Sequence, residues 1–414
     1  MLVDTRFAIM LSLSYYSTIS FLLAWIGLSC ATPATPSYDG SRGGKPVAHI
    51  KNGTYEGLYS PNYNQDFFLG LPYAQPPLKD LRFANPVSLN TTWAGPRDVS
   101  SYSPACVGYG PSQWGYPLSE NCLYLNVIRP AGIHKPLPVA VWIHGGGYVQ
   151  GSGVDLRYNL SFIVNQSVVI GHPIIGVTLN YRLSAWGFLQ SDEVKQSGNS
   201  NFGLRDQRLA LHWLQENIAA FGGKSWLLLV LVNSPTKGAG DPKQVTIWGQ
   251  SAGAMSVGSH LLAFNGRDDS LFRAAIMESG GPASLAAATQ SFQLFYSNLT
   301  QKTGCDEVTD SLQCLRSLSF EKLNAAINTT SLAGAWRPDL DGDFIQRHSL
   351  RQLADDAFVH IPILIGTNSD EATTLASPSN INTTEQFQEL LLGKLLFRVS
   401  TSISNTRQTM GSRH

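Results

Sequence analysis

Ser251 occupies the centre of the pentapeptide GQSAG, residues 249–253, which has the G-x-S-x-G spacing of a nucleophilic serine. The strand-like stretch "QVTIW" precedes it and an Ala/Gly-rich helical pattern follows, which is the context that this motif requires. Such a turn is crowded, so side chains at Gly249 and Gly253 would clash with a neighbouring strand or helix. The pattern predicts that the Ser251 hydroxyl projects near the positive end of the helix. The alternative interpretation is an ordinary strand-to-helix turn.

A glycine-rich loop, "IHGGGY", follows another strand-like run about 100 residues earlier. Ester hydrolysis places negative charge on the former carbonyl oxygen, and closely approaching backbone N–H groups stabilise that charge. Gly145, Gly146 and Gly147 allow such an approach, and the N–H of Ala252 after the nucleophile adds a donor. His144 in this loop is interpreted as a packing or loop-positioning residue rather than a base.

The acid that would orient a catalytic imidazole is predicted to be Glu371, in "IGTNSDEATT" after the strand-like "IPILIG". Asp370 on the same loop is the alternative, and a solvated acidic loop is the interpretation without a function. In hydrolases with the G-x-S-x-G motif, the serine comes before the acid in the sequence, and Ser251 and Glu371 have this order.

The histidine of this class should follow the acid, but His414, the last residue, is the only histidine after Glu371. It follows a polar tail, and a terminal residue without a packed strand is not held within hydrogen-bond reach of a hydroxyl. The other histidines precede the acid: His49, His134, His144, His172, His212, His260, His348 and His360. We therefore expect that the general base is missing from this chain.

The elements that would position these groups alternate between strand and helix. Apolar runs such as "LPVAVWI", "PIIGVTL" and "QVTIW" have the composition of buried strands. "NFGLRDQRLALHWLQENIAAFGG" and "AGAMSVGSHLLA" are typical of helices, the first ending at Gly222 and Gly223. This order predicts an α/β fold with a mostly parallel central sheet and helices on both faces.

The whole chain has 414 residues, 43% of them hydrophobic, and 29 basic residues balance 29 acidic ones. The balance argues against a nucleic-acid partner and favours a neutral or weakly charged ligand. No His/Cys/Asp/Glu cluster in the sequence has the spacing of a metal site, so neither a metal nor another cofactor is expected.

The N-terminus predicts secretion. Arg6 precedes a long apolar stretch and then small residues, so residues 1–34 are interpreted as a signal peptide and short leader. A membrane anchor is the alternative, although embedded polar residues argue against a span in the mature chain. Sequons favour a glycoprotein and begin at Asn52, Asn90, Asn159, Asn165, Asn298, Asn328 and Asn382.

Four cysteines remain after the leader and allow three pairings. The two short loops, Cys106–Cys122 and Cys305–Cys314, need the least rearrangement of the chain. Four unpaired thiols are the alternative, which an oxidising compartment disfavours.

Together these stretches resemble the type-B carboxylesterase/lipase family of α/β-hydrolases, which includes cholinesterases and neuroligin-like adhesion proteins. The resemblance covers roughly residues 45–376 and includes "ENCLYLNVIRP", "VWIHGGGY", "NFGLRDQRLALHWLQENIAAFGG", "VTIWGQSAGAMS" and "FRAAIMESGGP". It implies a serine ester hydrolase without a cofactor, acting on a small-molecule or lipid ester. Its site residues would be the nucleophile, the acid and the oxyanion-hole donors: Ser251, Glu371, Gly146, Gly147 and Ala252. The family's short disulfide loops fall on the two pairs favoured above.

The chain departs from the family pattern in two places. Residues 224–240, "KSWLLLVLVNSPTKGAG", interrupt the family junction between helix and nucleophile strand, and we interpret them as a retained intron, with a lid or extra strand as alternatives. A non-native tail is predicted at 394–414, so the hydrolase domain at 45–393 would be incomplete at its C-terminus. We expect impaired esterase activity for this chain; the alternative is a catalytically dead member that acts in binding or adhesion.

Overall fold

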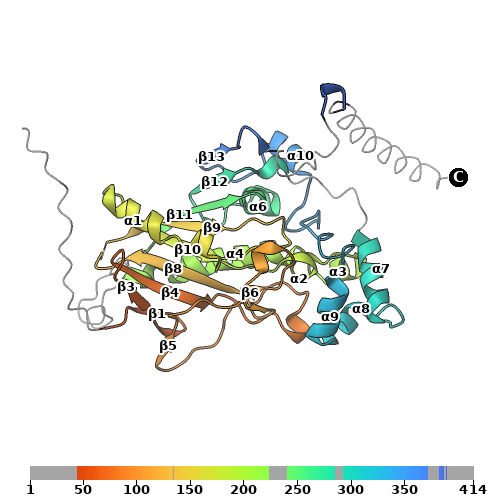
Figure 1. Ribbon diagram of the computed structural model, residues 1–414, viewed down its shortest axis with the longest axis horizontal. Coiled ribbons are helices and arrows are strands. Elements are labelled where there is room, and N and C mark those ends of the chain that lie inside the picture. The colour runs from red at the N-terminus through yellow and green to blue at the C-terminus, as the bar shows by residue number, and fades with distance from the viewer. Residues whose placement is uncertain are drawn as a thin grey trace, which may run out of the picture. The chain divides into compact units, whose positions relative to one another are not determined.

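The computed structural model describes residues 44–133, 135–222, 240–284, 292–371, 382–386 and 388. The predicted leader at 1–34 and tail at 394–414 lie outside the described residues. Of the segment 224–240, interpreted above as a retained intron, only Gly240 is described. Described residues from Gly44 onward belong to a single compact unit built around an eight-stranded sheet (Figure 1).

The strands of the central sheet have the order β13-β12-β11-β9-β10-β8-β4-β3. Their bounds are β3 Leu58–Ser60, β4 Gln65–Pro72, β8 Tyr124–Pro130, β9 Leu137–Ile143, β10 Ile175–Leu179, β11 Gly240–Gln250, β12 Ala274–Glu278 and β13 Ile363–Gly366. The run from β13 to β10 is parallel throughout, and β8, β4 and β3 continue it in antiparallel pairing. The mostly parallel sheet predicted from the sequence is confirmed.

Side chains that alternate in direction along the strands form two apolar cores, one on each face of this sheet. In β9, Val139, Val141 and Ile143 belong to the main core, whereas Trp142 between them belongs to the smaller one. This follows from the period of two in a strand, because successive side chains point to opposite faces. The parallel strands are therefore apolar on both faces, as the uninterrupted run "VAVWI" indicates.

Helices cover both faces. Helix α4 (Phe202–Asn217) and helix α6 (Ala252–Gly266) contact each other and β11, while α1 (Ser161–Val169) packs on β8 and β10 with the smaller core. Both helices predicted from the sequence are present at the expected places. The other α-helices are α2 Ser184–Phe188, α3 Asp192–Gln196, α7 Phe292–Thr303, α8 Ser311–Ser317, α9 Phe320–Ile327 and α10 Ser349–Ala354.

Smaller elements complete the described part of the chain. Strands β1 (Val47–Ile50), β2 (Gly53–Glu56) and β5 (Pro96–Asp98) form a three-stranded sheet, and β6 (Ala105–Cys106) pairs with β7 (Leu118–Ser119). Short 3₁₀ helices are η1 Lys79–Leu81, η2 Pro111–Gln113, η3 Leu156–Tyr158, η4 Ile218–Gly222 and η5 Pro282–Ser284. Within the described ranges no helix is long and apolar enough to cross a bilayer.

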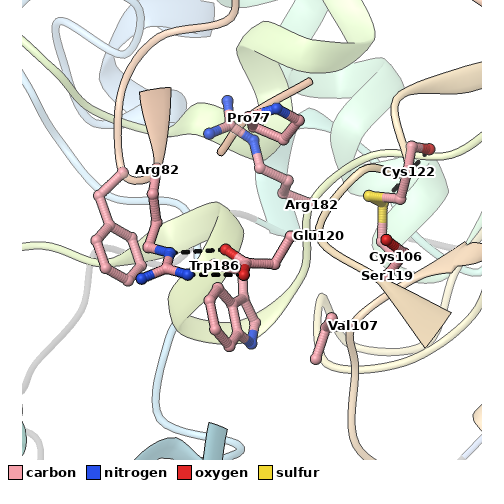
Figure 2. A pocket seen from close by; sticks show the side chains of 10 residues that line it. Pro77, Arg82, Cys106, Val107, Ser119, Glu120, Cys122, Arg182 and Trp186 are labelled. Atoms are coloured by element: carbon pink, nitrogen blue, oxygen red, sulfur yellow. Dashed lines mark hydrogen bonds and ion pairs between the residues drawn. A yellow bond between two sulfur atoms is a disulfide. The ribbon is translucent and has the colours of Figure 1, made fainter. Parts of the chain in front are cut away.

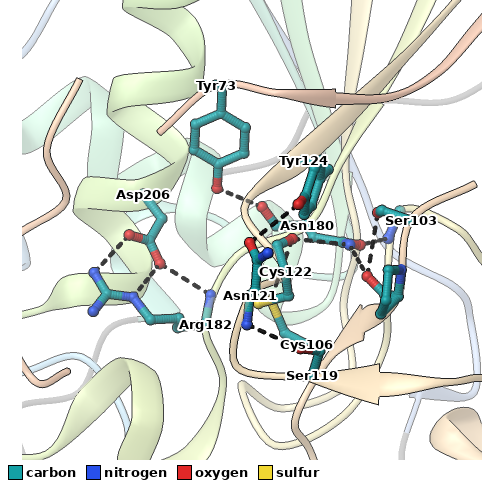
Figure 3. Close-up of a disulfide and its surroundings, with 12 residues drawn as sticks. Tyr73, Ser103, Cys106, Ser119, Asn121, Cys122, Tyr124, Asn180, Arg182 and Asp206 are labelled. Carbon is teal, nitrogen blue, oxygen red and sulfur yellow. Dashed lines mark hydrogen bonds and ion pairs between the residues drawn. A yellow bond between two sulfur atoms is a disulfide. The ribbon is translucent and has the colours of Figure 1, made fainter. Parts of the chain in front are cut away.

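Two disulfides join Cys106 to Cys122 and Cys305 to Cys314, which is the short-loop pairing. The first lies beside the carboxyl end of β10, where the Asn180 amide donates to the carbonyl of Cys122 at 3.1 Å (Figure 3). The Tyr73 hydroxyl donates to the Asn180 carbonyl at 2.6 Å. The closed loop is thus tied to the end of a core strand.

A buried ion pair connects this loop to the region of the second disulfide. Arg82 contacts Glu120 through two hydrogen bonds of 2.7 Å, and Trp186 lies beside them (Figure 2). The same guanidinium donates to the Leu318 carbonyl at 2.7 Å, just after α8, which carries Cys314. The cavity around the pair is only about 10 Å³, so this region is packed interior with room for one water at most.

Candidate active site

Ser251 stands between β11 and α6 with a strained backbone. Its φ is 54° and its ψ is −123°, in a region that residues with a side chain rarely adopt. Its N–H donates to the Glu278 carbonyl at 2.9 Å, and its own carbonyl accepts from the Met255 N–H in the first turn of α6. The strained turn is therefore held on both sides by hydrogen bonds, and it presents the serine at the N-terminus of the helix.

The glycines on either side of Ser251 are required by close backbone approach. A Cβ at Gly249 would lie 2.5 Å from the Gly253 carbonyl carbon, and one at Gly253 would lie 2.0 Å from the Ile143 carbonyl oxygen. Neither contact can be relieved by a side-chain rotation, because both partners are backbone atoms. The crowding expected from the motif is present in the structure.

The glycine-rich loop after β9 lies directly against this turn. A Cβ at Gly145 would be 3.2 Å from the Ser251 Cβ and 2.5 Å from the Gln250 carbonyl oxygen. Within the described residues, the N–H groups of Gly146 and Gly147 donate no hydrogen bond. The N–H of Ala252 opens α6, where the helix itself offers no acceptor. These amides are chemically suited to stabilise an oxyanion.

A cavity of about 240 Å³ opens over the serine. Its lining is mainly apolar and aromatic, with a few polar groups: Gly147, Tyr148, Ser251, Ala252, Met255, Ser284, Gly334, Trp336, Arg337 and Pro338. Trp336 is fully buried and stacks on Phe292. A space of this size and character fits the acyl or alcohol part of a small ester.

Glu371 lies at the same edge of the sheet as Ser251. Strands β11, β12 and β13 are parallel and in register, so Gln250, Glu278 and Gly366 lie side by side, and the residues after them meet at one edge. The Asn368 N–H donates to Glu371 at 2.8 Å. A hydrogen bond from the Ser279 hydroxyl, followed by that of Asn368, lowers the pKa of Glu371. The side chain therefore favours the charged form that would orient an imidazole.

No histidine in the described ranges hydrogen-bonds to Ser251 or Glu371. His144 is buried, stacks on Tyr181 at 4.3 Å and contacts the Gly145 carbonyl, and burial lowers its pKa to about 4. This agrees with a packing role. His414 lies outside the described residues.

Comparison with known proteins identifies the family to which this architecture belongs. The sequence model of the carboxylesterase family matches residues 44–231 and 237–409. The chain belongs to the carboxylesterase family. The break in the match, residues 232–236, lies inside the segment interpreted above as a retained intron.

Curated relatives in the carboxylesterase family include fungal lipases. Lipase 4 of Diutina rugosa is 37% identical over 385 residues, which are 83% of this chain and 65% of the relative. The protein named secreted triacylglycerol lipase LIP1 of Gibberella zeae is 33% identical, over 87% of this chain and 63% of the relative. The chain thus spans just under two thirds of the length of each of these relatives.

Two solved esterase structures are similar to this chain in both fold and sequence. Aspergillus niger EstA has a TM-score of 0.69 at 31% identity, covering 81% of this chain and 62% of that chain. A PNB esterase has a TM-score of 0.67 at 31% identity, and the match covers 87% of this chain and 72% of that chain. The α/β-hydrolase fold inferred from the sequence is confirmed.

Sequence reasoning missed part of the carboxylesterase cavity. Tyr148, which directly follows the three glycines, lines the cavity over Ser251. Trp336 was not anticipated, because it comes from an irregular segment about 85 residues after the nucleophile. Ser279 could have been found, since it directly follows the strand beside the nucleophile strand.

Proposed function

We propose that this chain carries the nucleophilic half of a carboxylic ester hydrolase, with Ser251 attacking the ester carbonyl. The Ser251 hydroxyl would pass its proton to an imidazole base while its oxygen bonds to the carbonyl carbon, and the oxyanion of the tetrahedral adduct would accept hydrogen bonds from the amides of Gly146, Gly147 and Ala252. Collapse of the adduct would break the bond to the alcohol oxygen, which takes the proton from the imidazole, and leave an acyl-enzyme that water hydrolyses to the acid and free Ser251. The observation that carries the proposal is the strained turn at Ser251 beside the amides of Gly146 and Gly147, which donate no hydrogen bond within the described residues.

Glu371 is proposed as the acid that orients an imidazole and stabilises it when charged. Its place at the shared carboxyl edge of β11, β12 and β13 and its lowered pKa support this role. Asp370 beside it is exposed and is the alternative acid. The disulfides are assigned a purely structural role.

The substrate is proposed to be an uncharged small-molecule or lipid ester. The mainly apolar cavity over Ser251 supports this class, as does the name of the Gibberella zeae relative, a triacylglycerol lipase. We propose no cofactor, since each step uses only serine, carboxylate, imidazole, backbone amides and water.

The general base is the group that no described residue provides near Ser251, since no described histidine hydrogen-bonds to Ser251 or Glu371. Without it, a serine is a weak nucleophile at neutral pH, and loss of the histidine in a well-studied serine protease costs about 10⁶-fold in kcat. We therefore propose that this chain alone hydrolyses esters slowly. Added imidazole should act as a substitute base and raise the rate.

Hydrolysis of p-nitrophenyl butyrate by the purified chain, with and without imidazole, tests the proposal. Since imidazole also cleaves this ester in solution, the Ser251→Ala variant is the matched control. A rate increase that the native chain shows and Ser251→Ala lacks supports the proposal. Equal rates for the two proteins at every imidazole concentration contradict it and favour a catalytically dead binding protein.

Secretion is proposed from residues 1–34, the two disulfides and the names of several relatives, which include the secreted lipase 1 of Botryotinia fuckeliana. N-terminal sequencing of protein from the culture medium should find a start near residue 35. We also propose that the domain spans 45–393, with an intron-derived segment at 224–240 and a non-native tail at 394–414. Sequencing of the spliced transcript tests the proposals for 224–240 and for 394–414. Codons for 224–240 in the spliced message would refute the interpretation of that segment as an intron.

A further inference from the structure

A buried hydroxyl connects the glycine-rich loop to the first turn of helix α6. Ser256 lies four residues after Ala252 in α6 and is fully buried. Its Oγ donates to the Ala252 carbonyl at 2.9 Å. The same Oγ lies 3.5 Å from the hydroxyl of Tyr148, the residue that directly follows Gly147. Ser256 therefore contacts both parts of the chain whose amides are the proposed oxyanion donors.

Tyr148 ties the glycine-rich loop to its surroundings. Its φ is 64°, in the left-handed region that residues with a side chain rarely adopt. Its carbonyl accepts from the Ser184 N–H at 2.7 Å, and its ring packs edge-on against Phe188 at 5.0 Å. A strained residue keeps its conformation only where its neighbours hold it, and the Tyr148 hydroxyl meets its neighbour in Ser256.

Ser256 is itself held from helix α4. The Gln207 amide nitrogen donates to the Ser256 Oγ at 3.1 Å, and the Gln207 Oε1 lies 3.0 Å from the Nε2 of His260. Burial lowers the pKa of His260, so its ring is neutral, and the proton on Nε2 is donated to Gln207. All three side chains are fully buried, and a satisfied buried network of this kind is rigid.

The bond from Ser256 to Ala252 has an ordinary explanation by itself, because a serine inside a helix often donates to the carbonyl four residues earlier. Ser259 makes the same bond in the same helix, to the Met255 carbonyl at 2.8 Å, and is equally buried. Among the described residues, the Ser259 hydroxyl has no second partner. The contacts of Ser256 with α4 and with the glycine-rich loop are therefore additional to the ordinary helix bond.

We propose that Ser256 is a positioning residue for ester hydrolysis. It holds the glycine-rich loop and the first turn of α6 at the separation that lets their amides reach one oxyanion. The inference rests on the proposed function, in which the amides of Gly146, Gly147 and Ala252 stabilise that charge. Such stabilisation depends on donors that are already in place before the reaction. Ser256 acts through these amides and touches neither the ester nor the nucleophile.

The variant Ser256→Ala removes the contact and leaves the glycine-rich loop and the first turn of α6 less tightly joined. Negative charge on the oxyanion develops in the transition state, so misplaced amides lower kcat more than they raise KM. Complete loss of one oxyanion-hole donor costs about 10²–10³-fold in kcat, and misplacement should cost less, about tenfold.

Hydrolysis of p-nitrophenyl butyrate at a fixed imidazole concentration tests the proposal, with the rate of Ser251→Ala subtracted throughout. We expect Ser256→Ala to lower kcat about tenfold and to leave KM within about twofold of the native value. The matched control is Ser259→Ala, which removes a buried helix-bonded hydroxyl of the same kind. Its kcat and KM should both stay within about twofold of the native values.

A double-mutant cycle checks that the effect travels through the contact between the two hydroxyls. Tyr148→Phe removes only the other hydroxyl and should lower kcat about fivefold. Because the two variants break one shared contact, the double variant should lose about tenfold rather than the product of the separate losses. Tyr148→Phe also tests the proposal if Ser256→Ala fails to fold.

A purely structural role makes a different prediction: Ser256→Ala would lower the free energy of unfolding in urea while kcat stays at the native value. That result overturns the inference, as do equal losses of kcat in Ser256→Ala and Ser259→Ala, or losses that multiply in the double variant. In each of these cases the native chain still shows a rate that depends on Ser251, so the proposed function survives. A native chain without such a rate contradicts the proposed function and this inference together.

Discussion

At the scale of the residue, the central feature is a serine held in a conformation that costs free energy. The positive φ of Ser251 is maintained by hydrogen bonds to β12 and α6 and by glycines whose neighbours leave no room for a Cβ. A plain turn between strand and helix would not need both features. The strain is therefore most simply explained by the presentation of the hydroxyl beside amides that no described acceptor engages.

Gly253→Ala tests how tightly this turn is packed. The new Cβ would meet the Ile143 carbonyl oxygen at 2.0 Å and the His144 carbonyl oxygen at 2.9 Å, so either strand β9 or helix α6 must move. We expect a loss of about 3 kcal/mol or more in the free energy of unfolding, at the upper end of overpacking effects. Urea denaturation measures it.

Gly366→Ala is the matched control, because a Cβ there meets no atom of the described residues within 4 Å and the residue has no positive φ. Its effect should stay below about 1 kcal/mol. If the two variants are equally stable, the close approach of backbone around Ser251 is not what the structure describes.

At the scale of the element, the Arg82–Glu120 pair links the loop closed by the first disulfide to the end of α8. Both side chains are less than 10% exposed, so removal of one leaves a buried charge without its partner. Glu120→Gln should lower the free energy of unfolding by about 3–5 kcal/mol. Thermal and urea unfolding under oxidising conditions check this.

An exposed pair supplies the comparison. Lys45 and Asp98 are 58% and 55% exposed at 3.2 Å, and Lys45→Met should cost no more than about 1 kcal/mol. A Glu120→Gln effect as small as that of Lys45→Met would show that the pair does not hold the two disulfide regions together.

The elements that carry the chemistry were largely predictable from the sequence, because local pattern and tertiary role agree there. The apolar run "VAVWI" becomes β9, and the motif around Ser251 becomes the β11–α6 turn. Trp336 and Arg337 were not predictable, since they lie in an irregular segment whose position depends on long-range packing against α7.

At the scale of the whole molecule, two buried imidazoles make stability depend on pH. Burial lowers the pKa of His144 to about 4, and burial also lowers that of His260, which contacts Gln207. Below pH 6.5 the unfolded chain binds protons that the folded chain does not, so stability falls as the pH decreases from about 6.5 toward 4. For His144 the full effect is about 3 kcal/mol.

His144→Asn should flatten this dependence, because the unfolded variant has one fewer imidazole to protonate. Urea denaturation of both proteins from pH 7 to pH 4 measures the difference in slope. His172→Asn is the control, since it removes a solvent-exposed imidazole instead. A His144→Asn protein with the native slope would mean that His144 is protonated as readily in the folded state as in the unfolded state.

The most direct test of the account maps the site of covalent reaction. The purified chain is incubated with a fluorophosphonate in imidazole buffer, digested and analysed by mass spectrometry, with Ser251→Ala in parallel. We predict one phosphonylated peptide, modified at Ser251, whose yield rises with imidazole concentration and which is missing from Ser251→Ala. A folded native chain that stays unmodified at Ser251, or that reacts only at another residue, contradicts the assignment of Ser251 as the nucleophile.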